Sequence, residues 1–126
     1  ILVIDDSTEV HDLVRQAIGR DHEVFAVTSW ADAGNLLFRG RMDLVLLDVN
    51  MPVVTGDRIA EIVSRSSLAP PRIVLFSAMD EGDLRRIARR VKAAGYLPKT
   101  FDPETLRRRL MALLETGTAT PVKPPA

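Results

Sequence analysis

The hydrophobic and polar positions divide the chain into short apolar runs that alternate with segments of helical periodicity. Residues 1–4 form an uninterrupted aliphatic run, which is typical of a parallel strand covered on both faces. From Val10 to Ile18 the apolar positions recur with the spacing of one helix face, which predicts a helix capped by Ser7 or Thr8 that ends near Gly19. The chain therefore opens with a strand followed by a helix.

The same alternation continues to residue 115. Further strands are predicted at residues 23–28, 44–47, 73–76 and around 96–97. Further helices are predicted over residues 31–38, around 59–63, over 81–94 and over 103–115 with Asp102 as cap. Residues 116–126 are rich in Thr, Gly and Pro and cannot fold alone, so we expect a flexible tail or a linker.

Five strands that alternate with five helices predict an α/β fold over residues 1–115. Parallel neighbours need crossover helices, and this favours a doubly wound five-stranded parallel sheet, (βα)5, of flavodoxin-like strand order 2-1-3-4-5. In such sheets ligands bind beyond the carboxyl ends of the strands. The residues that end the predicted strands are therefore the candidates for function.

Composition narrows the classes of function. The chain has 126 residues, the size of one domain, and no cysteine, which excludes disulfide scaffolds, cysteine-ligated metal centres and cysteine nucleophiles. Its 17 basic and 17 acidic residues cancel, which argues against non-specific binding to nucleic acid or membranes. No apolar run approaches the roughly 20 residues that cross a bilayer, so we expect a cytoplasmic protein. Ile1 reads as the inside of a strand, and we expect the native N-terminus to be missing.

Polar residues gather at the predicted strand ends. Asp5 and Asp6 follow the first strand, Asp48 the third, Ser77 closes the fourth, and Lys99 follows the fifth. Crowded carboxylates repel one another, and a hard divalent cation such as Mg²⁺ relieves that repulsion. The cation, an ammonium and a hydroxyl would together balance a phosphoryl group. Asp48 ends the most apolar strand and is the best candidate for a nucleophile, with Asp5 and Asp6 as metal ligands.

Together with Met51-Pro52 and Gly56 after Asp48, and Ala78 after Ser77, these residues resemble the receiver domain of two-component response regulators. The resemblance covers about residues 1–115. It implies that Asp48 accepts a phosphoryl group from a histidine kinase or a phosphotransfer protein in a bacterial phosphorelay.

The resemblance also assigns the other residues of the site. Mg²⁺ would be held by Asp6 directly, by Asp5 mainly through water, by Asp48 and by the main-chain carbonyl of Asn50. Ser77 and Lys99 would contact the phosphoryl group, and Tyr96 would turn inward when Ser77 moves. The small Ala78 would leave the approach to Asp48 open. The implied function is a phosphorylation-activated switch that turns over only its own phosphoryl group and is not an enzyme for external substrates.

Two features depart from the family pattern. Most receivers have a proline in a cis peptide after the lysine, whereas Thr100 follows Lys99 here, and a non-proline cis bond costs about 2.5 to 4 kcal/mol. The loop is therefore open to a trans path that places Lys99 differently. Met79 and Asn50 occupy positions that tune dephosphorylation in the family, and Met79 has no group to orient a water.

Arginines gather on two of the predicted helices, and the cluster has two interpretations. Its members are Arg85, Arg86, Arg89, Arg90 and Lys92 on helix 81–94, with Arg107, Arg108 and Arg109 on helix 103–115. Solvation alone explains most such faces. The family uses the face formed by these helices and the strand at 96–97 for output, which favours a downstream protein, a linked output domain or a phosphorylation-dependent homodimer. An acidic protein suits this face better than nucleic acid.

Other interpretations stay open beside the switch. Strand-end aspartates also occur as simple helix caps. A degenerate receiver would bind a partner without being phosphorylated, and Thr100 keeps that alternative alive. A Mg²⁺-dependent phosphatase or phosphotransferase would need substrate loops or a cap that the short predicted loops do not supply. His11 and His22 lack the spacing of ligands and are expected to be neither metal ligands nor phosphate carriers.

Overall fold

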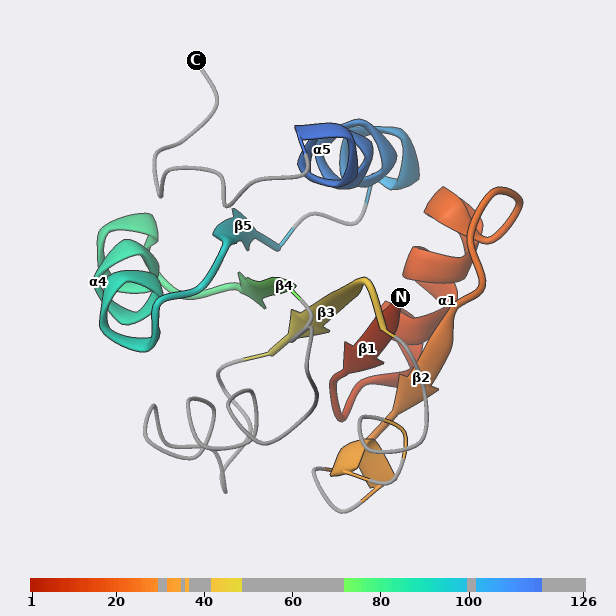
Figure 1. Ribbon diagram of the computed structural model, residues 1–126, viewed down its shortest axis with the longest axis horizontal. Helices are drawn as coiled ribbons and strands as arrows, with labels where there is room; N and C mark the ends of the chain where they lie inside the picture. The colour runs from red at the N-terminus through yellow and green to blue at the C-terminus, as the bar shows by residue number, and fades with distance from the viewer. Residues whose placement is uncertain (30–31, 35, 37–41, 49–71, 100–101, 117–126) are drawn as a thin grey trace.

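The computed structural model describes residues 1–29, 32–34, 36, 42–48, 72–99 and 102–116 (Figure 1). The elements in these ranges are, in chain order, β1 (Leu2–Ile4), α1 (Thr8–Ile18), β2 (Phe25–Val27), β3 (Leu44–Leu47), β4 (Arg72–Ser77), α4 (Glu81–Val91), β5 (Gly95–Pro98) and α5 (Pro103–Thr116). Residues 32–34 and 36 are helical, as expected for part of the segment 31–38. The helix expected around 59–63 lies outside the described residues.

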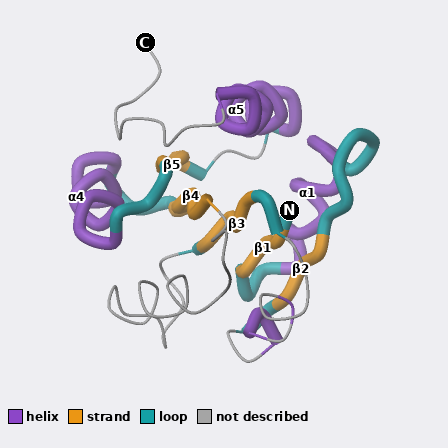
Figure 2. Tube along the Cα trace, viewed as in Figure 1, coloured by secondary structure: helices purple, strands orange, loops and turns teal. Residues whose placement is uncertain are grey.

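The five strands form one parallel sheet of order β2-β1-β3-β4-β5, which confirms the predicted fold (Figures 1 and 2). β1 lies between β2 and β3, with Leu2 paired to both Phe25 and Val45. The chain therefore adds β2 on one side of β1 and then crosses to add β3, β4 and β5 on the other side. This change of side is the topological switch point where doubly wound sheets bind their ligands.

Helices cover both faces of the sheet: α1 and α5 lie on one face and α4 on the other (Figure 1). Because side chains alternate along a strand, each strand contributes to both cores. Toward α1 and α5 point Val3, Leu44, Leu46, Val74, Phe76 and Leu97. Toward α4 point Leu2, Ile4, Val45, Leu47, Ile73, Leu75 and Tyr96. The continuous apolar runs of the sequence are explained by this burial on both faces.

The helix ends follow local hydrogen bonding. Ser7 caps α1, and its Oγ accepts from the Val10 N–H at 3.4 Å. Asp102 caps α5, as predicted, by accepting from the Thr105 N–H at 3.3 Å. The expectation that the helix beginning at Glu81 extends to residue 94 was wrong. Lys92 adopts a left-handed conformation (φ 58°), which ends α4 at Val91 and turns the chain into β5.

Candidate functional site

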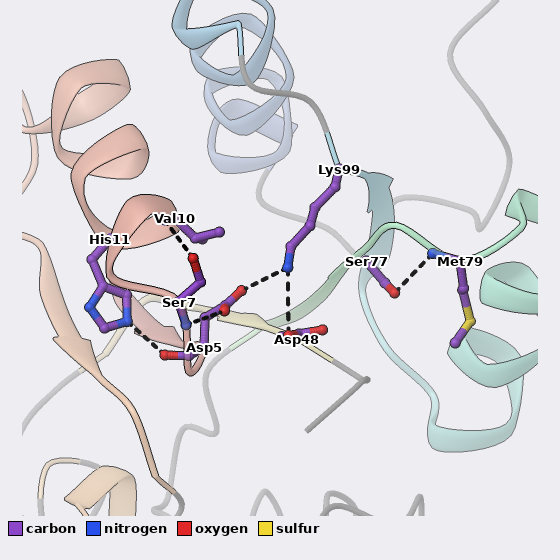
Figure 3. Close-up of polar contacts among 8 residues, drawn as sticks. All are labelled: Asp5, Ser7, Val10, His11, Asp48, Ser77, Met79 and Lys99. Carbon is purple, nitrogen blue, oxygen red and sulfur yellow. Dashed lines mark hydrogen bonds and ion pairs between the residues drawn. The ribbon is translucent and has the colours of Figure 1, made fainter. Parts of the chain in front are cut away.

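The sheet register brings the predicted site residues to one edge. Ile4 pairs with Leu47, and the Asp48 N–H donates to the Ile4 carbonyl at 3.0 Å, so Asp5 and Asp48 follow adjacent parallel strands. At the ends of β4 and β5 the Lys99 N–H donates to the Ser77 carbonyl at 2.8 Å. All of these residues therefore lie at the carboxyl edge of the sheet (Figure 3).

Asp5, Asp6 and Asp48 form a carboxylate cluster, in which one oxygen from each lies within 4.8 Å of the others. Asp5 and Asp48 are buried, with 1% and 4% of their surface exposed, while Asp6 is exposed. The Lys99 ammonium is close to both buried members, at 3.2 Å from Asp5 Oδ2 and 3.5 Å from Asp48 Oδ2. The three carboxylates and the ammonium together carry a net charge of two negative units when all are ionised, which one divalent cation would neutralise.

The electrostatics of Asp5 also fit a metal. Burial raises the pKa of Asp5, and repulsion from Asp48 adds to the rise, whereas the Ser7 N–H and Lys99 act in the opposite direction. The Ser7 N–H donates to Oδ1 at 2.8 Å. Oδ2 is buried, and the Lys99 ammonium lies 3.2 Å from it. A buried carboxylate oxygen with this environment is a suitable ligand atom for a hard cation.

Lys99 reaches the cluster despite the departure from the family pattern at the next residue. Its side chain is 14% exposed, and its Nζ lies 5.9 Å from the centre of the Phe76 ring as well as beside the two carboxylates. The Lys99 side chain therefore lies at the site although a proline does not follow it. Thr100 itself lies outside the described residues.

Ser77 and Tyr96 connect the site edge to α4. Ser77 is fully buried, and its Oγ accepts from the Met79 N–H at 3.2 Å (Figure 3). Tyr96 is 6% exposed, and its hydroxyl accepts from Arg85 Nε at 3.2 Å. The sequence did not single out Arg85 as a partner of Tyr96. Arg85 lies on α4 and Tyr96 on β5, and only the packing of these two elements brings the side chains together. Ala78 is exposed.

The remaining predicted site residue, Asn50, lies outside the described residues, as do Met51-Pro52 and Gly56. His11 is a residue near the site that sequence reasoning missed. It is 6% exposed, and its Nε2 lies 2.8 Å from the Asp5 carbonyl oxygen (Figure 3). The signal in the sequence is its place on the helix that follows Asp5. His22 lies elsewhere, in the segment between α1 and β2.

A family profile described as the response regulator receiver domain matches residues 1–111 of the chain. The chain belongs to this family. The strand order β2-β1-β3-β4-β5 agrees with that membership. So does the aspartate cluster at the carboxyl edge of the sheet, which could hold a metal ion. The chain is thus a regulatory receiver domain of the two-component type.

Individual proteins show the same likeness. The alkaline phosphatase synthesis transcriptional regulatory protein SphR of Synechococcus elongatus is 31% identical, with 100% of this chain and 52% of the relative covered. The sensor histidine kinase TmoS of Ectopseudomonas mendocina is 27% identical, over 90% of this chain and 12% of the relative. The chemotaxis protein CheY4 of Vibrio cholerae is 26% identical with a TM-score of 0.78, covering 89% of this chain and 95% of that one.

The receiver therefore spans about half, or less, of the first curated relatives that it matches. Within the described ranges, the helices are all too short or too polar to cross a lipid bilayer.

Proposed function

We propose that this receiver is a phosphorylation-activated switch in which Asp48 accepts a phosphoryl group from a histidine kinase or a phosphotransfer protein. One observation supports the proposal: the buried Asp48 carboxylate lies 3.5 Å from the Lys99 ammonium, and one of its oxygens lies within 4.8 Å of an oxygen of Asp5 and of Asp6. A carboxylate nucleophile, a fixed cation and two further carboxylates are the groups that phosphoryl transfer to an aspartate requires.

The carboxylate cluster supports Mg²⁺ as the metal. We assign Asp6 and Asp48 as direct ligands, Asp5 as a ligand mainly through water, and the main-chain carbonyl of Asn50 as the fourth protein group. Mg²⁺ prefers oxygen ligands, keeps several waters and needs only one or two direct carboxylates. When bound, the ion would neutralise negative charge on the phosphoryl oxygens.

The protein groups account for the transfer itself. A carboxylate oxygen of Asp48 forms a bond to phosphorus as the P–N bond of the donor's phosphohistidine breaks, and the leaving imidazole nitrogen keeps the electron pair of that bond. Lys99 already lies beside the Asp48 oxygen, so it is placed to pair with an oxygen of the transferred group. Such preorganisation lowers the barrier, because the cation need not move during the reaction.

Ser77 and Tyr96 would relay the change to α4. The Ser77 Oγ accepts from the Met79 N–H, and we propose that the hydroxyl shifts toward the phosphoryl group and donates its hydrogen to a phosphoryl oxygen, which weakens the bond from Met79. Tyr96 lies on the α4 side of the sheet and is tied to Arg85, so movement in the β4–α4 segment reaches it directly. Phosphorylation would thus shift the population of an α4-β5-α5 face.

We propose that this face contacts a downstream protein, a covalently linked output domain or a second receiver, and does not bind nucleic acid itself. Its exposed cations on α4 and at the C-cap of this helix include Arg89, Arg90 and Lys92, which favour an acidic contact surface. The relatives SphR and TmoS are much longer than this receiver, which supports a role as one part of a multidomain signalling protein. The expected location is the cytoplasm of a bacterium.

Intact-mass measurement after incubation with Mg²⁺ and acetyl phosphate tests the proposal. The wild type should gain about 80 Da, the mass of one phosphoryl group. The Asp48→Asn variant should gain nothing, because an amide cannot accept the group. Asp43→Asn is the matched control: Asp43 is exposed and precedes the other end of β3, so its loss should leave the gain intact.

Two results would count against the proposal. A gain that persists in Asp48→Asn would place the acceptor elsewhere. Absence of any gain, in wild-type protein that binds Mg²⁺ by calorimetry, would instead identify the domain as a phosphorylation-independent binding module.

A further inference from the structure

His11 is a buried imidazole that neither the metal nor the phosphoryl chemistry uses. It lies on α1 among the buried apolar residues Val10, Leu13 and Val14. A polar ring in such surroundings is unfavourable unless it forms a hydrogen bond. The bond that it forms, 2.8 Å from Nε2 to the Asp5 carbonyl oxygen, reaches back to the first residue after β1 (Figure 3).

The chemistry of the two partners fixes the direction of this bond. A carbonyl oxygen only accepts, so Nε2 of His11 carries the hydrogen and donates. The other polar groups of Asp5 are also held: its N–H donates to the Val27 carbonyl at 3.1 Å, and its Oδ1 accepts from the Ser7 N–H at 2.8 Å. His11 thus completes the fixation of Asp5 through its main-chain carbonyl.

The consequence for Asp6 follows from peptide planarity. The Asp5 carbonyl is coplanar with the nitrogen and Cα of Asp6, so fixing the carbonyl fixes the direction in which Asp6 leaves the sheet. Asp6 is exposed, and its surroundings therefore hold it weakly, yet one of its oxygens belongs to the 4.8 Å carboxylate cluster. The orientation of the Asp5–Asp6 peptide therefore sets the direction of the Asp6 side chain relative to the Asp5 carboxylate, which Ser7 and Lys99 also hold.

We infer that His11 is a positioning residue for the metal site: its Nε2–H orients the Asp5–Asp6 peptide and so keeps the two carboxylates in cation-binding geometry. The inference rests on the proposed function, because it assumes that the cluster binds Mg²⁺. Groups that orient metal ligands commonly affect metal affinity by about 10- to 100-fold when they are removed. Here the bond acts through one peptide, and we expect the lower end of that range.

The test compares Mg²⁺ dissociation constants, measured by calorimetry on folded protein, for two substitutions at this position. His11→Leu removes the donor but keeps a buried apolar side chain, and it should weaken Mg²⁺ binding by about 10-fold. His11→Gln carries an amide N–H the same number of bonds from Cα as Nε2, and it should recover most of the affinity.

Leu13→Ala is the matched control for a purely structural role. Leu13 is buried on the same helix, so its truncation lowers the melting temperature without touching the bond to Asp5. It should leave the Mg²⁺ affinity at the wild-type value. Equal loss of affinity in Leu13→Ala and His11→Leu, or wild-type affinity in His11→Leu, would overturn the inference.

A measurement on the wild type covers the case in which His11→Leu fails to fold. Nitrogen-15 NMR of the imidazole should show the Nε2–H tautomer, and the Nε2 signal should move when Mg²⁺ is added. An Nδ1–H tautomer, or a signal indifferent to Mg²⁺, would refute the positioning role. If wild-type protein binds no Mg²⁺ at all, the proposed function fails together with this inference. If it binds Mg²⁺ and is phosphorylated while His11→Leu is unaffected, only this inference fails.

Discussion

The Asp5 carboxyl is held in the folded protein under conditions that disfavour its charge. It is buried, it lies beside the buried Asp48 carboxylate, and burial is the largest cause that raises its pKa. The Ser7 N–H and the Lys99 ammonium compensate only in part, since the net direction is upward. The carboxylate cluster is therefore electrostatically unfavourable in the metal-free state.

Replacement of Asp5 by Asn should stabilise the metal-free domain at pH 7. The pKa of Asp5 is raised in the folded state above its unfolded value of about 3.9. The contribution of Asp5 to the free energy of unfolding is therefore fully present below about pH 3.9 and is lost as the pH rises through the folded-state pKa. Asn removes the charge and keeps the Oδ1 acceptor for Ser7. Thermal melts in metal-free buffer should show a melting temperature several degrees higher for Asp5→Asn at pH 7, and this gap should close near pH 3.5.

The exposed Asp43, at the opposite end of β3, provides the comparison. Asp43→Asn should leave the melting temperature at pH 7 close to that of wild type, because the Asp43 carboxylate is exposed and stays hydrated in the folded protein. A lower melting temperature for Asp5→Asn than for wild type at pH 7 would contradict the sign of the argument.

At the scale of elements, strands and capped helices could be predicted from the sequence because local patterns specify them. Aliphatic runs mark β1 and β3, and Ser7 and Asp102 cap the helices that they precede. The end of α4 was missed, since a left-handed Lys92 carries no sequence signal comparable to a glycine.

The candidate site was predictable for a related reason. In a parallel sheet the strand-end residues share one edge, so Asp5, Asp48 and Lys99 could be grouped before their distances were known. Contacts between side chains of different elements, such as Arg85 with Tyr96, depend on rotamers and helix packing and left no pattern to detect.

The bond between α4 and β5 carries a prediction of its own. Arg85 Nε donates to the hydroxyl of Tyr96, the only tyrosine of the chain, and so favours the buried position of that ring. Arg85→Met removes the donor and should increase exchange of Tyr96 between positions. Ring signals of labelled tyrosine in NMR spectra should shift or broaden in this variant.

Arg86→Met is the control for that experiment, because Arg86 lies on the exposed side of the same helix and pairs with Asp83 instead. Its tyrosine spectrum should match that of wild type. Identical spectra for Arg85→Met and wild type would show that the α4 contact does not hold the ring.

On the scale of the whole molecule, the two sides of the sheet are tied differently. On the α1 and α5 side, Arg107 donates to the Ala17 carbonyl at 3.1 Å and pairs with Asp21, which joins the two helices. Arg72 donates to the Leu113 carbonyl at 2.7 Å, which joins α5 to β4. On the other side, α4 packs against the sheet through the buried Leu84 and Ala88 and the partly buried Ile87 and Val91, and Arg85 bonds to Tyr96 of β5. The α4 side is the one joined to the site edge through Ser77 and Met79, so we expect a change at the site to reach it first.

Phosphorylation should consequently change hydrogen exchange on one side of the sheet only. With Mg²⁺ and acetyl phosphate, amide exchange should alter in residues 77–91, because the shift of the Ser77 hydroxyl weakens its bond from the Met79 N–H in the segment that leads into α4. Residues 10–18 and 106–113 should keep their exchange rates, since the Arg107 and Arg72 bonds do not involve the phosphoryl site. Asp48→Asn treated in the same way should show neither change. Equal changes in both regions of the wild type would mean that the domain responds as a single rigid unit, and that the α4-β5-α5 face is not singled out by the switch.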